Sequence, residues 1–321
     1  MPAIRATGLR RNFGGTVAVA GLDLEVAAGE IFGLVGPDGA GKTTTIRMLT
    51  GVLRPDAGTA EVAGCDVVRE AGALKEHIGY MSQRFGLYPD LTVRENIEFY
   101  ADIYGVASQG RAERIAQLLG FSNLTPFQQR LAGDLSGGMK QKLGLACALI
   151  HTPRVLFLDE PTNGVDPVSR RDFWRILYQL ARDGVTLFVS TAYLDEAERC
   201  NRLALLHQGR VVGLGTPAEI KALLRGALLE VRTSAPRRTA ALLRERLADA
   251  TVGLFGDRVH VHVASRDAAA VESHTRELIA GAGFVLQAIR PIAPSLEDVF
   301  VSVLATQALP GSDPAVTSLK E

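Results

Sequence analysis

The sequence predicts a two-domain α/β protein, in which a parallel sheet carries an inserted helical subdomain and a smaller α+β domain follows. Three observations support this prediction. The 321 residues exceed the usual size of one domain and are 47% hydrophobic. Short apolar runs of strand length alternate with helical stretches, and after residue 225 the pattern changes to a βαββαβ order. We expect domains at residues 1–225 and 226–305, and a flexible tail at 306–321.

The first domain begins with short β segments around Gly14-Gly15, followed by the apolar run Ile31–Val35. That run has the length of a buried strand, and it ends in a glycine-rich loop that opens a helical pattern. Two similar apolar runs, separated by an amphipathic helix, imply a parallel sheet. These runs are Val155–Leu158 and Thr186–Ser190, and the helix covers Asp172–Ala181.

Three helical stretches between these strands predict the inserted subdomain. They are Thr92–Tyr104, Arg111–Leu119, and a helix that Leu135-Ser136-Gly137-Gly138 opens and that continues to Ile150.

The second domain follows a helix over Pro217–Leu224 that Gly226 closes. Its βαββαβ order matches the ferredoxin-like split βαβ arrangement. Its titratable residues are scattered without a motif, so we expect it to add no catalytic group. The predicted strands are Leu228–Arg232, Val252–Phe255, Val259–Val263 and Phe284–Ile289, and the predicted helices are Arg238–Leu247, Ala268–Ala280 and Leu296–Leu304.

Charge and hydropathy argue against several classes of protein. Lys plus Arg and Asp plus Glu number 35 each, so the chain lacks the basic field of a nucleic-acid binder. No stretch approaches the roughly 18 apolar residues that span a bilayer, and the N-terminus lacks the apolar core of a secretory signal. Cys65, Cys147 and Cys200 are far apart and lack the spacing of metal ligands, so we expect them to be small buried hydrophobic residues. We expect a cytoplasmic protein without a nucleic-acid partner.

Residues 36–44 predict a phosphate-binding loop between a strand and a helix. Glycines let backbone N–H groups converge on phosphate oxygens, Lys42 can reach the outer phosphates, and the Thr43 hydroxyl can bind Mg²⁺. The alternative, a chance glycine-rich turn, explains neither the lysine nor the hydroxyl. The nucleotide-binding residues expected here are Gly36, Pro37, Asp38, Gly39, Ala40, Gly41, Lys42, Thr43 and Thr44.

Two carboxylates follow the apolar run that ends at Leu158. Parallel α/β sheets place ligands at the carboxyl ends of their strands. Asp159 can therefore hold Mg²⁺ through water, and Glu160 can polarise the water that attacks a phosphoryl group. An ordinary acidic strand end is the weaker alternative once the phosphate-binding loop is taken into account.

The segment Leu135-Ser136-Gly137-Gly138-Met139-Lys140-Gln141 places a hydroxyl and two glycines where a helix begins. Its N–H groups could face an anion, although a plain helix cap would also explain Ser136 and Gly137. Together with Leu156-Phe157-Leu158-Asp159-Glu160-Pro161, it resembles the signature and second nucleotide motif of ABC transporter ATPases. This resemblance implies a P-loop NTPase of the ABC ATPase type that hydrolyses ATP with Mg²⁺.

In that family two ATPase domains stack head to tail, so the resemblance implies that residues 136–138 serve the partner's ATP. It also implies that Phe13 stacks on adenine, that Gln83 links Mg²⁺ and water to the permease contact, and that Asp166 lies at the dimer interface. Each residue has an alternative on its own. Phe13 could be core, Gln83 a solvated loop residue, and Asp166 a helix N-cap before Pro167.

Two further segments resemble the ATPases of ABC-2 type export systems, whose substrates include drugs, antibiotics and polysaccharides. The small C-terminal domain is also similar to the accessory domain of that subgroup. The resemblance implies an integral-membrane ABC-2 type permease, a second ATPase domain, and attachment to the inner face of the cell membrane through the permease. The segments are Arg84-Phe85-Gly86-Leu87-Tyr88 with Asp90–Asn96, and Ser295-Leu296-Glu297-Asp298-Val299-Phe300.

Two positions depart from the family pattern. Asp38 stands where the family often has asparagine, and repulsion by phosphate favours an outward, solvated or capping position for its carboxylate. Ala192 stands where the family's switch histidine falls, and its methyl group cannot donate a hydrogen bond to the γ-phosphate. We therefore expect a slow ATP site paired with a non-identical second ATPase. A working homodimer is the alternative if Glu160 and an ordered water suffice or if Tyr193 turns inward.

Two other functions remain open at this point. A soluble ABC ATPase acting on ribosomes or DNA would usually carry paired ATPase domains or long coiled-coil insertions, and this chain has neither pattern. A nucleotide-dependent regulatory subunit with little hydrolysis is compatible with Ala192.

Overall fold

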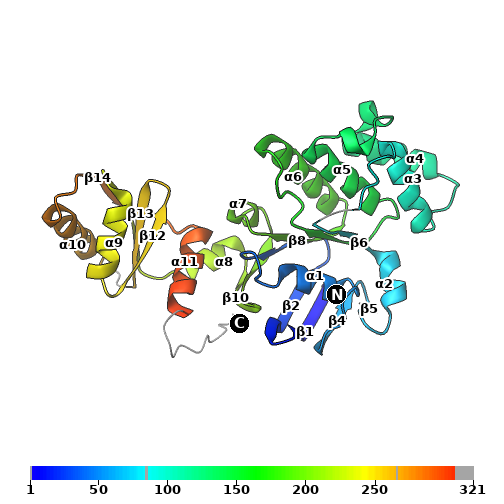
Figure 1. Ribbon diagram of the computed structural model, residues 1–321. Helices are drawn as coiled ribbons and strands as arrows, with labels where there is room; N and C mark the ends of the chain where they lie inside the picture. The colour runs from blue at the N-terminus through cyan, green and yellow to red at the C-terminus, as the bar shows by residue number, and fades with distance from the viewer. Residues whose placement is uncertain (1, 84–85, 265–266, 308–321) are drawn as a thin grey trace. The chain divides into compact units, whose positions relative to one another are not determined.

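The computed structural model describes residues 2–83, 86–264 and 267–307 (Figure 1). The chain divides into two compact units, Met1–Val211 and Val212–Glu321, and the division falls within strand β10. Arg84 and Phe85 of the export-type segment lie outside the described residues, as does the predicted tail from 308 onward. Among the helices that the structure describes, none is long and apolar enough to cross a membrane.

A six-stranded sheet in the order β10-β9-β3-β8-β7-β6 forms the centre of the first unit. The pairs β3/β8, β3/β9, β7/β8 and β6/β7 are parallel, which confirms the predicted parallel core. The strands are β3 (Ile31–Val35), β6 (Ile78–Met81), β7 (Val155–Asp159), β8 (Thr186–Thr191), β9 (Arg202–His207) and β10 (Arg210–Gly215).

Both faces of this sheet are buried, which explains why its strands are continuously apolar rather than alternating. Leu156 and Leu187 belong to the hydrophobic cluster shared with helices α5 and α6, whereas their chain neighbours Phe157 and Phe188 belong to the cluster shared with α1. Figure 1 shows α5 and α6 on one side of the sheet and α1 on the other. The helices are α1 (Lys42–Leu49), α5 (Gly137–Ala148) and α6 (Pro167–Arg182).

An antiparallel sheet in the order β2-β1-β4-β5 packs in the same cluster as α1. Its two N-terminal strands meet at the Gly14-Gly15 turn, and each is 12 residues long, so they exceed the short segments that the sequence predicted. The strands are β1 (Pro2–Phe13), β2 (Thr16–Ala27), β4 (Ala57–Val62) and β5 (Cys65–Asp66), and helix α2 (Ala71–His77) follows.

The inserted helical subdomain is confirmed between β6 and β7. Thr92 begins its first helix with a capping box, in which its side chain accepts the N–H of Glu95 and the Glu95 carboxylate accepts the N–H of Thr92. The elements before α5 are α3 (Val93–Ile103), α4 (Arg111–Phe121), η1 (Thr125–Phe127) and η2 (Ala132–Asp134), and the short α7 (Leu194–Ala197) follows β8.

The second unit contains an antiparallel sheet in the order β12-β13-β11-β14. Its last strand begins two residues later than predicted, because Phe284 donates its N–H to Ile279 and so completes the end of α10. The elements are α8 (Pro217–Ala222), β11 (Ala227–Thr233), α9 (Pro236–Arg246), β12 (Ala250–Phe255), β13 (Arg258–Val263), α10 (Ala268–Gly281), β14 (Leu286–Pro291) and α11 (Leu296–Gln307).

Candidate nucleotide site

The glycine-rich loop joins β3 to α1 and requires glycine at two positions. A Cβ atom at Gly36 would lie 2.2 Å from the carbonyl oxygen of Leu206. Gly41 has φ +105°, and a Cβ atom there would lie 2.3 Å from the carbonyl oxygen of Ala18. The loop can therefore hold its curvature only with these glycines. Between them, Pro37, Asp38 and Gly39 are exposed and Ala40 is buried, so Asp38 lies in the exposed part of the loop.

Lys42 opens α1 and is only 4% exposed. Its ammonium group donates to the carbonyl oxygens of Gly36 at 2.8 Å and Pro37 at 3.0 Å. It also forms an ion pair with Glu160, at 3.0 Å from Nζ to Oε1. Three oxygens therefore take up the three N–H bonds of this ammonium group.

Glu160 follows the carboxyl end of β7 in a left-handed backbone conformation, with φ +50°. A non-glycine residue in this region costs on the order of 1–3 kcal/mol, and such residues are enriched at active sites. Its N–H is held by Ser190, at 3.0 Å from Oγ and 3.2 Å from the carbonyl oxygen. The turn thereby directs the carboxylate toward Lys42.

The second carboxylate oxygen of Glu160 accepts hydrogen bonds from two amides. Gln83 Nε2 lies 3.0 Å away and Asn163 Nδ2 lies 3.4 Å away. The structure thus brings together all three predicted catalytic residues, Lys42, Glu160 and Gln83. The amide of Asn163 was not predicted.

Asp159 has the environment of a cation ligand. Its side chain is 1% exposed, and Ser190 Oγ donates to Oδ1 at 2.6 Å. The other oxygen, Oδ2, is buried without a hydrogen-bond partner among the described residues. An unpaired buried carboxylate oxygen is costly, and a Mg²⁺ ion or its bound water would satisfy it. The other residues predicted to bind Mg²⁺ are Thr43, which is half-buried in the first turn of α1, and Gln83, whose amide donates to Glu160.

The signature residues are placed elsewhere in the first unit, on the helical subdomain. Ser136 is exposed and caps α5, where its Oγ accepts the N–H of Met139 at 3.3 Å. Gly138 is buried, and a Cβ atom there would lie 2.6 Å from the Cβ of Ser169 on α6. Gly137 between them is exposed. The glycine at 138 thus has a packing role, whereas residues 136 and 137 are available to a ligand.

Asp166 caps α6 and is exposed, as the alternative interpretation predicted. Its Oδ1 accepts the N–H groups of Val168 at 3.0 Å and Ser169 at 2.9 Å. Hydrogen bonds from Ser169 are the main cause that holds the pKa of Asp166 below its usual value. The interface role of Asp166 stays a prediction.

Phe13 and Ala192 are both exposed. Phe13 ends β1 and is 49% exposed, so it is not core, and the Arg11 guanidinium lies 5.0 Å from the centre of its ring. Ala192 follows β8, and the next residue, Tyr193, packs its ring 4.3 Å from the Arg170 guanidinium.

Residues 19–163 match the ABC transporter family. The chain is 36% identical over 304 residues to the daunorubicin resistance ATP-binding protein DrrA2 of Streptomyces coeruleorubidus, and the match covers 93% of this chain and 94% of that protein. The chain belongs to the ATP-binding subunits of ABC transporters. The predicted resemblance is therefore confirmed.

One further relative and one solved structure are similar to this ABC ATPase. It is 51% identical over 225 residues to the probable multidrug ABC transporter ATP-binding protein YbhF of Escherichia coli, and the match covers 70% of this chain but only 39% of that protein. A solved structure of an ATP-binding subunit of an ABC transporter matches with a TM-score of 0.63 at 27% identity, covering 69% of this chain and 92% of the other. The predicted cassette fold is thus confirmed.

Several polar residues near the site of this ABC ATPase were not predicted. Ser190 could have been found, because it ends the predicted apolar run Thr186–Ser190, and the parallel pairing of β7 with β8 places it opposite Asp159. Asn163 follows Glu160 closely, but its residue type carries no motif of its own. Tyr193 was named from the sequence only as a side chain whose inward turn would allow a working homodimer. Arg170 and Glu196 have no signal in the sequence, since only the fold brings these residues of α6 and α7 to the 3.5 Å of their ion pair.

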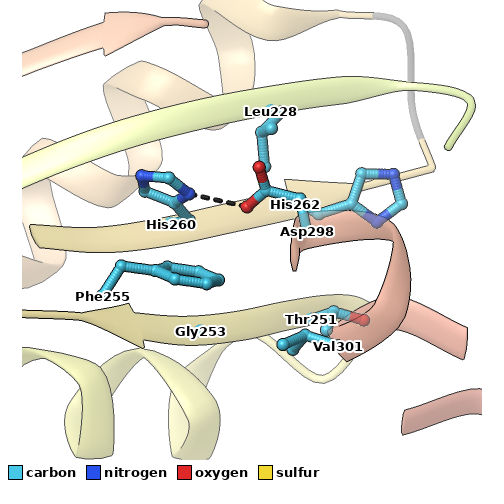
Figure 2. Close-up of a pocket in the computed structure, with 8 residues that line it drawn as sticks. All are labelled: Leu228, Thr251, Gly253, Phe255, His260, His262, Asp298 and Val301. Atoms are coloured by element: carbon cyan, nitrogen blue, oxygen red, sulfur yellow. Dashed lines mark hydrogen bonds and ion pairs between the residues drawn. The ribbon is translucent and has the colours of Figure 1, made fainter. Parts of the chain in front are cut away.

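The C-terminal unit of this ABC ATPase contains a separate polar cluster at a small hollow of about 10 Å³, enough for about one water. Figure 2 shows His260, on β13, directed toward Asp298 of α11. His260 Nδ1 donates to Asp298 at 2.6 Å, and its Nε2 lies 3.9 Å from Glu230. The lining residues are Leu228, Thr251, Gly253, Phe255, His260, His262, Asp298 and Val301.

This cluster predicts acid sensitivity of the C-terminal unit. Burial raises the pKa of Asp298, but hydrogen bonds from His260 and Ser295 outweigh it and leave the pKa below its usual value. A carboxylate with a lowered pKa stabilises the fold above about pH 4 and loses that effect as the pH falls through the lowered value. We expect Asp298→Asn to destabilise the unit by about 1–2 kcal/mol at pH 7 and by less at pH 3, where the carboxyl group of the unfolded chain is largely protonated.

Thermal unfolding monitored at both pH values checks this expectation, with the exposed Asp249→Asn as the matched control. An equal loss of stability for Asp298→Asn at pH 7 and pH 3 would show that its charge is not the stabilising feature.

Proposed function

We propose that this ABC ATPase hydrolyses ATP to ADP and phosphate and thereby energises export through a separate ABC-2 type membrane permease. The observation that carries the proposal is the meeting of Lys42, Glu160 and Gln83 beside the phosphate-binding loop. Transfer of a phosphoryl group to water needs a cation on the phosphate, a group that polarises the water, and a polar group that orients it. These three side chains supply those functions.

The other residues of the site fit this reaction. The loop amides of residues 36–44 would hold the phosphates, and Phe13 would stack on the adenine. Thr43, Asp159 and Gln83 would hold Mg²⁺, which neutralises phosphate charge when bound. Lys42 would exchange the Glu160 carboxylate for a phosphate oxygen, and the freed carboxylate would polarise the attacking water. ATP binding would therefore also activate the base, because the phosphate replaces Glu160 as the partner of Lys42 and frees its carboxylate.

A second ATPase domain is part of the proposal, because the signature residues are not bonded to the loop of their own chain among the described contacts. Ser136 and Gly137 are exposed where a 12-residue helix begins, which supports binding of the partner's ATP by N–H groups and a hydroxyl. Asp166 would lie at that interface. The permease would hold the assembly at the inner face of the membrane.

The C-terminal unit would be a ferredoxin-like accessory domain. Its chain order β11-α9-β12-β13-α10-β14 and its strand order β12-β13-β11-β14 support this assignment, since all the recorded pairs are antiparallel. We assign it a regulatory or dimer-supporting role and no catalytic group.

The proposed substrate class is a drug or a similar exported compound. It is supported by the names of the relatives, which describe multidrug transport and daunorubicin resistance.

Replacing Ala192 tests how the site works. We expect the purified chain to hydrolyse ATP slowly and Ala192→His to raise the rate roughly a hundredfold, because a donor to a phosphate oxygen contributes on the order of 2–4 kcal/mol to the transition state. ATP affinity should change little. The steady-state ATPase rate is the measurement, and Ala192→Leu is the control for added bulk without a donor.

Rapid hydrolysis by the parent chain, unimproved by histidine, would contradict the mixed dimer and favour a homodimer. Slow turnover of both chains, even with a candidate permease, would favour the regulatory subunit that Ala192 permits.

A further inference from the structure

A chain of polar contacts joins the segment around Ala192 to the Glu160 carboxylate. Tyr193 OH donates to Asn163 Oδ1 at 3.5 Å, and Asn163 Nδ2 donates to Glu160 Oε2 at 3.4 Å. The amide of Asn163 therefore uses its acceptor on the tyrosine and a donor on the carboxylate. Both distances are at the long end of the range, and hydrogen bonds of catalytic groups often shorten when the substrate binds.

Asn163 is held in this position by its own backbone. Its N–H donates to the carbonyl oxygen of Glu160 at 3.2 Å, which closes the turn after β7. Gly164 then takes a left-handed conformation with φ +72°. The side chain of Asn163 is thus returned toward the carboxylate of the residue that begins the same turn.

Tyr193 is held from both sides. Its ring packs 4.3 Å from the Arg170 guanidinium, and its N–H donates to Thr191 Oγ1 at 3.0 Å. Thr191 Oγ1 in turn donates to Glu196 at 2.8 Å. The tyrosine is 37% exposed, yet its ring stacks on a cation and its backbone is bonded to the end of β8.

Glu196 ties the two segments together. Its side chain is fully buried, accepts a hydrogen bond from Thr162, next to Asn163, and forms an ion pair with Arg170 at 3.5 Å. A buried carboxylate with several partners is a rigid connection, since each lost partner would leave a buried charge unsatisfied. Residues 160–163 and 191–196 should therefore move together.

We infer that Asn163 is a positioning residue for Glu160 and that Tyr193 holds Asn163 in place. Residues 191–196 then influence the reaction through the Glu160 carboxylate. The inference rests on the proposed ATP hydrolysis. Ala192 offers no donor to a phosphate oxygen. The next residue, Tyr193, still connects the same segment to the Glu160 carboxylate through Asn163. The effect should appear in the rate of the chemical step and not in ATP binding, because Asn163 contacts the base and not the loop.

Single-turnover hydrolysis with the full chain in excess over ATP tests the inference, and it remains measurable when turnover is slow. We expect Asn163→Ala to slow the step about tenfold while the Kd for ATP changes less than about twofold. Tyr193→Phe should slow it about threefold in the parent and not at all in the Asn163→Ala background, because the tyrosine acts only through the amide. In the Glu160→Gln background, Asn163→Ala should have no further effect. Gln179→Ala, an exposed amide on α6, is the control.

Three results would overturn the inference alone: hydrolysis by the parent that Asn163→Ala leaves unchanged, a loss of ATP affinity that accounts for the slower rate, or additive effects of the two variants. Asn163 is exposed, so a preserved melting temperature should accompany the slower step. Absence of hydrolysis by the parent itself, even in single turnover, would instead overturn the proposed function and this inference with it.

Discussion

Glu160→Gln is expected to reduce ATP turnover at least about a hundredfold, because an amide cannot accept the proton of the attacking water. The same change should tighten ATP binding. Lys42 is paired with Glu160 at 3.0 Å, and ATP must break that buried pair before a phosphate oxygen can take its place. A neutral amide at 160 would compete less with the phosphate.

Steady-state hydrolysis and calorimetric titration of ATP measure the two effects separately. Glu113→Gln, an exposed carboxylate on α4, is the matched control and should change neither quantity. If Glu160→Gln hydrolyses ATP at the parent rate, the base must be sought elsewhere. If it turns over slowly but binds ATP no better than the parent, the ion pair does not compete with the nucleotide.

Lys42→Ala is expected to weaken ATP binding at least about a hundredfold. The change removes a buried cation and also leaves the Glu160 carboxylate facing the phosphates without its partner, so attraction becomes repulsion. The double variant Lys42→Ala with Glu160→Gln should therefore regain part of the lost affinity.

Titration calorimetry on folded protein measures this, and Lys75→Ala, an exposed lysine on α2, is the control. Unchanged affinity in Lys42→Ala would remove the basis of the nucleotide site. A double variant no tighter than the single one would show that Glu160 does not oppose the phosphates once Lys42 is gone.

The elements of the fold could largely be predicted, because their signals are local. The strand at Ile31–Val35 is buried on both faces and is accordingly apolar throughout, and the capping box at Thr92 marks the start of α3 where the sequence placed a helix. A boundary at which two neighbouring elements compete for the same backbone N–H was less accurate. The start of β14 is the example, since the N–H of Phe284 is used by α10.

By itself, the sequence determined the phosphate-binding loop, the acidic end of β7 and the signature at α5. Each is a short segment whose glycines, charges and caps define its chemistry without help from the rest of the chain. The prediction of Lys42, Asp159 and Glu160 as one site followed from the rule that parallel strands present ligands at their carboxyl ends.

Only the tertiary structure decided which side chains of different segments meet. The left-handed turn at Glu160 returns the side chain of Asn163 to its carboxylate, and the ion pair between α6 and α7 places Arg170 beside Tyr193 and Glu196. Sequence patterns define which residues form a strand or helix, but contacts between segments depend on register and on the turns between them. The connection from Tyr193 to Glu160 therefore has no signature in the sequence.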